Sequence, residues 1–389
     1  MTVWTTLTLR VVTPLFSGDD PGQPDGGDPI RVPSIRGALR FWFRAVAAGH
    51  GVTDLAQLWA QEEQIFGSTR RPSAIALRVS GMPSRSDDRR PDWTMPPGLG
   101  AKDFHGAHYL LGMGLWRDGL TRQFVEPGRT FDLSIRFSRQ PDAEQVNARF
   151  MLALWAWLTY GGLGARVRRG FGQLRCVGHS GVPLPGRWAP GPLGSPTQQT
   201  TWELYCQTPV PRVISDFAAH GWTGTPPPGT PEFPLLGVPA WSGHFLPGEP
   251  AADLTMALHW AGVEWRAFRA VADPAGPITA DLHSPEWVHT IHGRSRNYPL
   301  AAFGLPVNYR GVTVDLMSSG QKIRRASPVW LRPVRLDGGW RTFTSLFRAQ
   351  LRPPGAELSR RLRMPDDATI ADSWDAWQND QNRLPDDYY

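Results

Sequence analysis

The stretch GGLGARVRRGFG at residues 161–172 constrains the fold of this chain most, because it places five glycines and three arginines in twelve positions. Glycine adopts positive φ readily and leaves no Cβ in the way of a neighbour, so such a run interrupts any regular element. Before it, residues 142–160 carry apolar side chains at helical spacing, at Val146, Phe150, Leu154 and Trp157. After it, residues 173–178 (QLRCVG) are typical of a strand. The sequence predicts a helix, a glycine loop and a strand, in that order.

The composition of this loop suits anions. Successive N–H groups in a glycine-rich loop form concave anion sites, and the guanidinium groups of Arg166, Arg168 and Arg169 match phosphate geometry. A flexible surface loop with solvated arginines is the alternative. The nucleotide-binding pattern GxxxxGK[ST] is absent.

The remaining patterns of the first half complete an α+β arrangement. Strands are expected at 2–13, 73–80, near 107–116 and 129–138, and helices at 35–48 (capped by Ser34) and 54–64 (capped by Thr53). Residues 82–105 are polar and proline-rich, which is typical of a long insertion loop. The order β-α-β-β-α-β with insertions is the ferredoxin-like arrangement.

At 389 residues the chain is long enough for two domains, and 41 glycines and 38 prolines indicate many loops. We predict an N-terminal domain at 1–180, a linker at 181–199, a C-terminal domain at 200–365 and an acidic tail at 366–389. Residues 200–210 (TTWELYCQTPV) match 5–15 (TTLTLRVVTPL) at five of eleven positions, which suggests a repeated first strand. Within the second domain we expect a helix and two basic strands, at 251–272, 321–336 and 342–351.

The charge is uneven. Residues 1–365 carry a net charge of +12 and residues 366–389 carry −6, and only Lys102 and Lys322 of the 41 basic residues are lysine. Arginine pairs with phosphate through two hydrogen bonds and stacks on bases. This favours a polyanionic partner, with the acidic tail as a mobile or docking segment.

The predicted helix at 35–48 carries two stripes. Ile35, Leu39, Trp42 and Val46 form an apolar stripe, and Arg36, Arg40 and Arg44 form a basic one beside it. A bound anion near the helix N-terminus would favour these arginines. Ion pairing with acidic neighbours is the alternative. Aromatic residues flank each arginine cluster, and arginine with aromatics is the pattern of single-strand binding.

Catalytic and metal-binding patterns are weaker. His289 and His292, with His283 nearby, share H-x-x-H spacing with His105 and His108, but we expect neither a metal site nor a cofactor. Asp19, Asp20, Asp25 and Asp28 could bind a cation or orient a ribose hydroxyl, although acidic turns are usually solvated. Cys176 and Cys206 form no disulfide framework, and no signal peptide or long apolar segment is present, so we expect a soluble, cytoplasmic protein.

Several of these segments together resemble the RAMP superfamily of CRISPR-associated proteins. They are TPLFSGDD (13–20), IRVPSIRGALRFWFRA (30–45), EEQIFGS (62–68), the glycine loop, FGLPVNY (303–309) and RRASPVWLRPV (324–334). In particular they look like the first RAMP subunit of type III-B (Cmr) effector complexes. Family members usually have glycines after TPLF, whereas this chain has Gly18, Asp19 and Asp20.

The resemblance implies two tandem ferredoxin-like (RRM-type) RAMP domains with long loop insertions. It also implies a non-catalytic subunit that binds CRISPR RNA and single-stranded target RNA beside other RAMP subunits, near the 3′ end of the CRISPR RNA. The RNA-binding residues expected on these grounds are Arg31, Arg36, Arg40, Arg44, Gly161, Gly162, Gly164, Arg166, Arg168, Arg169, Gly170, Lys322, Arg324 and Arg325. The alternative is a metal-independent endoribonuclease of the same superfamily, with His50 as its acid or base.

Overall fold

The structure is a computed structural model of the 389-residue chain. It describes residues 4–18, 27–86, 95–96, 98–100, 104–184, 196–210, 222, 224–270, 298–309, 312–350 and 355–379. The chain forms two compact units, each with helices and antiparallel strand pairs. The first unit comprises Met1–Pro91, Leu111–Gly229 and Leu235–Ser242, and the second comprises Asp92–Leu110, Thr230–Pro234 and Gly243–Tyr389.

A four-stranded antiparallel sheet forms the base of the first unit. Its spatial order is β2-β3-β1-β4, so the first strand of the chain is central. The strands are β1 (Thr5–Val11), β2 (Ala76–Ser80), β3 (Thr130–Arg136) and β4 (Leu174–Gly181). Leu7, Leu9 and Val11 alternate along β1 and are fully buried, as the period of a half-buried strand requires.

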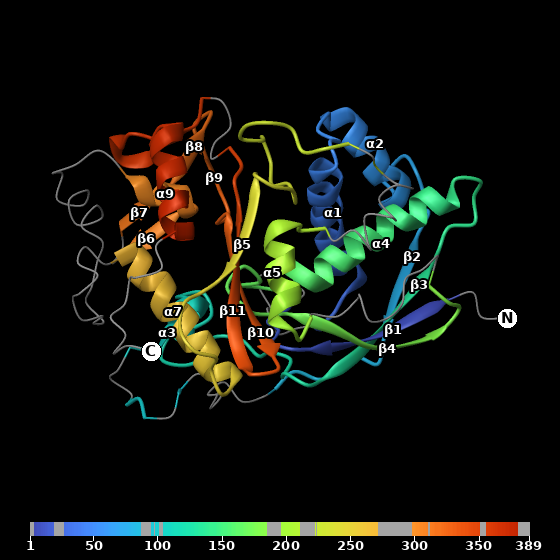
Figure 1. Cartoon of the computed structure of the whole chain (residues 1–389), viewed down its shortest axis with the longest axis horizontal. Coiled ribbons are helices and arrows are strands. Elements are labelled where there is room, and N and C mark those ends of the chain that lie inside the picture. The colour runs from blue at the N-terminus through green and yellow to red at the C-terminus, as the bar shows by residue number, and fades with distance from the viewer. Residues whose placement is uncertain are drawn as a thin grey trace. The chain divides into compact units, whose positions relative to one another are not determined.

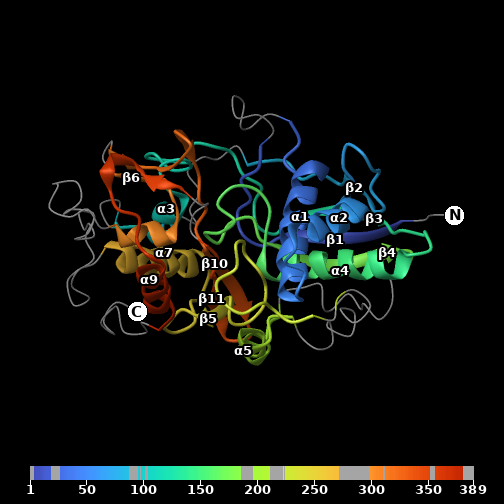
Figure 2. The same ribbon diagram turned by 90° about the horizontal axis from the view of Figure 1, so that it is seen from above.

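Three helices cover one face of this sheet (Figures 1 and 2). They are α1 (Val32–Gly49), α2 (Leu55–Phe66) and α4 (Ala143–Tyr160). The predicted apolar stripes of α1 and α4 are buried, and in α4 every residue from Val146 to Tyr160 is buried. The helix α4 therefore lies within the core and ends where the glycine loop begins.

The helix starts differ from the predicted ones. Helix α1 begins at Val32 and not after Ser34, because Pro33 suits the first turn of a helix. Arg31 is the N-cap residue. Helix α2 is capped by Asp54 rather than Thr53, since the Asp54 carboxylate accepts a hydrogen bond from the Gln57 N–H at 2.7 Å. Arg36 therefore lies in the second turn of α1.

Two predicted strands are wrong. Residues 107–116 contain helix α3 (Gly106–Leu111), and residues 200–210 contain helix α5 (Gln199–Gln207). In α5 the buried residues are Trp202 and Tyr205, three positions apart, and both contact Trp155 or Tyr160 of α4 through their rings. The match with residues 5–15 is therefore not a repeated strand, because packing of these two aromatics against α4 holds the segment as a helix.

The second unit is built on α7 (Leu254–Ala270) and several short sheets. One sheet has the order β10-β11-β5, another β12-β8-β9, and a third pairs β6 with β7. The predicted helix at 251–272 is confirmed by α7, and most of both predicted basic strands lies in strands. The strands are β5 (Trp241–Phe245), β6 (Val307–Tyr309), β7 (Val312–Val314), β8 (Leu316–Ser318), β9 (Gln321–Ile323), β10 (Val329–Leu336), β11 (Gly339–Phe347) and β12 (Glu357–Leu358). Two short 3-10 helices, Pro299–Phe303 and Ser359–Arg361, complete the unit.

The acidic tail begins with helix α9 (Asp367–Asn379). Ile370, Trp374 and Trp377 of this helix are buried. The Trp374 indole donates to the Ala302 carbonyl at 3.1 Å, and the Trp377 ring lies 4.9 Å from that of Trp265. This part of the tail docks on its own unit.

Among the residues that the structure describes, no helix has the length and apolar content that crossing a membrane requires.

Candidate nucleic-acid interface

The start of α1 lies close to the turn after β1. The Arg31 guanidinium donates a hydrogen bond to the Gly18 carbonyl at 3.0 Å, which ties the helix cap to the segment following TPLF. Arg36 is partly exposed, and its guanidinium has no hydrogen bond or ion pair within the described ranges. Of the predicted basic stripe, Arg36 is therefore the member that the fold does not engage.

The other two arginines of this stripe share one buried acid. Arg44 contacts Glu62 of α2 through two hydrogen bonds, of which Nη2 to Oε1 measures 2.8 Å, and the Arg40 Nε lies 3.5 Å from the same carboxylate. The Glu62 side chain is 4% exposed, whereas that of Arg44 is 51% exposed. Arg40 also donates to the carbonyls of Phe66 and Gly67. The ion-pair alternative is therefore correct for Arg40 and Arg44, whose side chains remain 33% and 51% exposed.

The glycine loop is packed closely against the segment that follows β1. Gly164 has φ of 89° and Gly172 has φ of 68°, values that side chains with a Cβ rarely adopt. A Cβ on Gly164 would lie 2.4 Å from the Phe16 carbonyl oxygen, and one on Gly172 would lie 1.9 Å from that of Leu163. Gly161, Gly162 and Gly164 thus allow the loop to pack closely against neighbouring atoms, and the alternative of a flexible surface loop is wrong.

Several loop N–H groups have internal acceptors. Leu163 donates to Gly172, Ala165 to Phe16, Arg169 to Arg166 and Gly172 to Pro14, at 2.7 to 3.0 Å. These amides hold the loop in place, and they are not donors for a ligand. The predicted nest of bare N–H groups is therefore reduced to the amides of Gly162, Gly164, Arg166, Val167 and Gly170, which have no backbone acceptor in the described part of the chain.

The arginines of this turn reach back to other elements. The Arg168 guanidinium carbon lies 5.7 Å from the centroid of the Phe41 ring of α1, a cation–π distance. Arg166, with φ of 61°, is exposed, and its guanidinium lies next to Gly112 and Gly114. The structure therefore brings the loop and α1 together through Phe41, a pairing that helical spacing alone did not predict.

The expected residues of the second unit have three different surroundings. Lys322 is 71% exposed and pairs with Asp315 at 2.9 Å. Arg324 is exposed. Burial lowers the pKa of Arg325, whose guanidinium donates to the Ala349 carbonyl at 3.5 Å. Arg325 is thus a structural residue of its unit, and Lys322 and Arg324 are those that face solvent.

The catalytic candidates are held by the fold or fall outside the described ranges. The His50 ring, at the end of α1, has Nδ1 2.9 Å from the Val46 carbonyl and stacks on Trp222, and burial lowers its pKa. His50 thus caps the end of α1, which is the structural alternative to a role as catalytic acid or base. Asp28 is exposed, whereas Asp19, Asp20, Asp25, His283, His289 and His292 lie outside the described residues.

Three histidines gather between α3 and α7. The rings of His105 and His108 are 4.8 Å apart, and the Gly106 N–H donates to His259 Nδ1 at 3.2 Å. Burial, with nearby histidines, lowers the pKa values of His108 and His259 to about 4. Among the described residues, no three His, Cys, Asp or Glu side chains are arranged to hold a metal ion.

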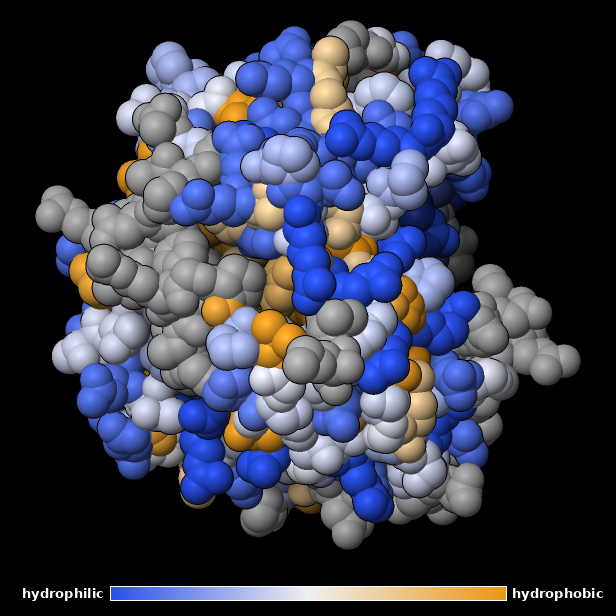
Figure 3. Space-filling model, turned by 90° about the vertical axis from the view of Figure 1, so that its right-hand side faces the viewer, coloured by the Kyte–Doolittle hydropathy of each residue, from blue (hydrophilic) through white to orange (hydrophobic). Residues whose placement is uncertain are grey.

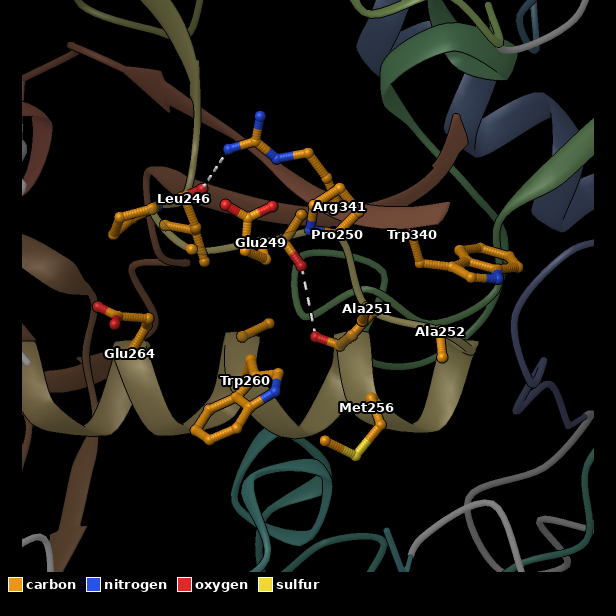
Figure 4. Close-up of a pocket in the computed structure, with 15 residues that line it drawn as sticks. Leu246, Glu249, Pro250, Ala251, Ala252, Met256, Trp260, Glu264, Trp340 and Arg341 are labelled. Atoms are coloured by element: carbon orange, nitrogen blue, oxygen red, sulfur yellow. Dashed lines mark hydrogen bonds between the residues drawn. The ribbon is translucent and has the colours of Figure 1, made fainter. Parts of the chain in front are cut away.

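The second unit also contains a cavity of about 250 Å³ between α7 and the segment before it (Figure 4). In this view α7 runs beneath Glu249, Pro250 and Arg341. The Arg341 guanidinium donates to the Leu246 carbonyl at 3.2 Å, so part of the wall is braced internally. None of the sequence-predicted residues lines this cavity, and we assign no chemistry to it.

Residues 8–175 match the RAMP superfamily. The CRISPR system Cmr subunit Cmr1-1 of Pyrococcus furiosus is 31% identical over 156 residues, which are 38% of this chain and 40% of that relative. The Cmr subunit Cmr1-2 of the same organism is 28% identical over 176 residues, or 43% of this chain and 91% of the relative. The match thus spans less than half of the first relative.

Two solved structures share the fold over 96% of this chain. The crystal structure of apo Cmr1 from Pyrococcus furiosus has a TM-score of 0.53 at 20% identity and is covered over 97% of its length. A chain of the type III-B Cmr-beta complex bound to cognate target RNA has a TM-score of 0.52 at 11% identity and is covered over 98%.

Proposed function

We propose that the chain is a RAMP-superfamily protein and a non-catalytic RNA-binding subunit of a type III-B complex in antiviral defence, which the match of residues 8–175 and the similarity to Cmr1 subunits support. It acts in the cytoplasm beside other RAMP subunits. It caps the assembly near the 3′ end of the CRISPR RNA and helps to capture single-stranded target RNA. The similar fold of a chain in a complex bound to target RNA supports RNA as the ligand.

The finer architecture is part of this proposal. It places two tandem ferredoxin-like domains at 1–180 and 200–365, with a linker at 181–199 and a tail at 366–389. The compact units differ from these bounds in that α5 belongs to the first unit and Asp92–Leu110 to the second. The sheet order β2-β3-β1-β4 beneath α1 and α4 supports this for the first domain. In the second, α7 and the sheet β10-β11-β5 would supply the corresponding layers.

The observation that carries the RNA-binding role is the contact between the glycine loop and α1. Arg168 over Phe41 places a guanidinium and an aromatic ring side by side, with Arg166 exposed beside them and Arg36 on the helix. Phosphates bind to the arginines and to the turn at 166–168, and the partly exposed Phe41 ring stacks on a base. Sequence is read by pairing between RNA strands, and the protein holds the backbone.

The other expected RNA-binding residues contribute in different ways. Arg31, Arg40 and Arg44 contribute charge while they brace the fold. Gly161, Gly162, Gly164 and Gly170 contribute the close approach that shapes the loop. In the second unit, Lys322 and Arg324 offer exposed charge for a separate RNA contact, and Arg325 braces its own unit through the Ala349 carbonyl. The engagement of His50 with Val46 and Trp222 supports a role without RNA cleavage.

The test is single-stranded RNA binding by the whole chain at several salt concentrations. The variant Arg166→Glu/Arg168→Glu/Arg169→Glu should lose binding. Its matched control is Arg70→Glu/Arg71→Glu/Arg139→Glu, which changes the charge equally in the turn between α2 and β2 and in the segment before α4, at residues outside the proposed site. The control should retain most of the affinity.

Backbone contact also predicts that log K falls steeply with log salt. An affinity that hardly changes with salt, or a loss of equal size in both variants, would contradict the proposed site. Turnover of RNA by the wild type that His50→Ala abolishes would favour the endoribonuclease.

A further inference from the structure

The face of the first sheet that α1, α2 and α4 leave uncovered has an unusual set of side chains. In antiparallel pairs, directly opposite residues share a face, so the register fixes its members. The charged and aromatic residues of this open face are Trp4, Arg10, Arg78, Asp132, Arg136 and Arg175. Four arginines against one aspartate give the face a net positive charge. The end of the molecule shown in Figure 3 is largely hydrophilic, with only small hydrophobic spots.

At one end of the open face two arginines oppose each other. Arg10 of β1 pairs in register with Arg175 of β4. Like charges directly opposite on neighbouring strands destabilise a sheet. Arg10 is exposed and Arg175 partly so. An anion bound between them would remove this repulsion. Arg175 also lies three residues beyond Gly172, so this end is continuous with the glycine loop in the chain.

At the other end two arginines converge on one aromatic ring. The guanidinium carbons of Arg78 and Arg136 lie 4.7 and 5.5 Å from the centroid of the Trp4 ring. Both arginines are exposed, and Trp4 is partly exposed. Arginine planes and an indole are the surfaces on which unpaired bases stack.

Between the two ends the face is polar and regular. Thr6 bonds to Ser134 at 2.9 Å, and Thr8 donates to Asp132 at 2.8 Å, which engages the one carboxylate of the face. From Trp4 to Arg10 the strand spans about 20 Å at 3.4 Å per residue. This strip has hydroxyls along its middle and cations at both ends.

We propose that the open face is a second contact surface for single-stranded RNA, on which the strand leaves the glycine loop, passes Arg10 and Arg175 and stacks at Trp4. The ligand class rests on the proposed function, whereas the surface is separate from the loop site. Positive charge with an aromatic anchor favours a nucleic acid over an acidic protein, because an acidic protein would need no stacking platform.

The first experiment uses the whole chain with Arg10→Gln/Arg175→Gln and a fluorescent single-stranded RNA. Loss of two phosphate contacts should reduce the slope of log K against log salt by about 1.4. The same variant should unfold at a higher temperature without RNA, because the opposed charges are gone. The control Arg70→Gln/Arg71→Gln removes the same charge from the turn between α2 and β2 and should change neither quantity.

The second experiment tests the stacking end. Trp4→Ala should weaken RNA binding about tenfold, within the range of a lost base–aromatic stack. Trp4→Phe should restore most of it. Trp59→Ala is the matched control, since Trp59 is 52% exposed on α2, away from this face.

The outcomes separate the two proposals. If the wild type binds RNA and the open-face variants bind it equally well, the second surface is refuted and the loop site stands. If the wild type binds no RNA, both are refuted. If the open-face variants bind RNA normally but no longer assemble with other subunits, the face is a protein contact and this proposal is wrong.

Discussion

The two units keep buried polar groups in different ways. In the first, Glu62 is buried but held by Arg40 and Arg44, and the loop amides donate to backbone carbonyls. In the second, histidines gather around the contact of α3 with α7, and burial lowers the pKa values of two of them to about 4. The Glu62 cluster of the first unit therefore depends on pairing, and the His105, His108 and His259 cluster of the second depends on keeping its histidines neutral.

This difference indicates which change would lower the folding stability of each unit. A paired carboxylate fails when its partner or its charge is removed, because the remaining charge is left uncompensated. A neutral buried histidine fails when a proton is added, because its acceptor nitrogen becomes a donor. The first unit should thus respond to mutation and the second to acid.

The largest effect is expected from Gly172→Ala. The added Cβ would meet the Leu163 carbonyl oxygen at 1.9 Å, and φ at this position is 68°. The free energy of unfolding should fall by about 4 kcal/mol, through backbone strain and overpacking together. Urea unfolding followed by tryptophan fluorescence measures it.

The same substitution at Gly37 is its control. Gly37 lies in α1 with nothing within 4 Å of an added Cβ, so Gly37→Ala should stabilise the chain by about 0.8 kcal/mol. Equal stability of the two variants would mean that the glycine loop is not packed as described.

The next effect is that of Glu62→Gln. Removing the buried charge should lower the free energy of unfolding by about 2 kcal/mol, less than for a fully buried pair because Arg44 is half exposed. The substitution also frees the guanidinium groups of Arg40 and Arg44 from their ion pairs, so RNA affinity should rise. The exposed pair of Glu126 with Arg129 supplies the control, since Glu126→Gln should change stability by no more than about 0.5 kcal/mol. A fall in RNA affinity in Glu62→Gln would argue against phosphate contact by Arg40 and Arg44.

The next prediction concerns the acid sensitivity of the second unit. His108, His244 and His259 have pKa values of about 4, below the 6.5 of the unfolded chain. The unfolded chain takes up protons first, so stability should fall as pH drops from about 6.5 to about 4 and not change by this cause above or below that window. Urea midpoints at pH 7 and pH 5 give the slope.

His259→Asn should reduce this slope, because an amide oxygen can accept from the Gly106 N–H without titrating. An unchanged slope in this variant would move the acid sensitivity to other groups.

The sequence predicted the elements with strong periodicity and missed those decided by tertiary contact. The stripes of α1 and α4 and the alternation in β1 are local patterns, and they agree with the structure. Helix α5 was mistaken for a strand because its nine residues carry only two buried aromatics, Trp202 and Tyr205. Their ring partners on α4 are distant in sequence, and no local pattern could reveal them.

The candidate site was predictable in its residue types and not in its pairings. Arginine stripes and glycine runs can be recognised in sequence, but the ion pairs of Glu62 and the position of Arg168 over Phe41 require the packing of α1 against its neighbours. The open face was missed although residues 5–10 alternate with period two. Attention to the polar positions of TTLTLR would have placed Arg10 opposite the core.

Helix α9 changes how the charge of this chain should be regarded. Its carboxylates, among them Asp375 in contact with Arg348, are carried on a helix fastened by Trp374 and Trp377. These carboxylates are held at fixed positions and do not move as the charges of a flexible tail would. A loose acidic segment would compete with a polyanion for the arginines and would raise the apparent dissociation constant at low salt. The carboxylates of α9, held in place by Trp374 and Trp377, should not compete with a bound polyanion in this way.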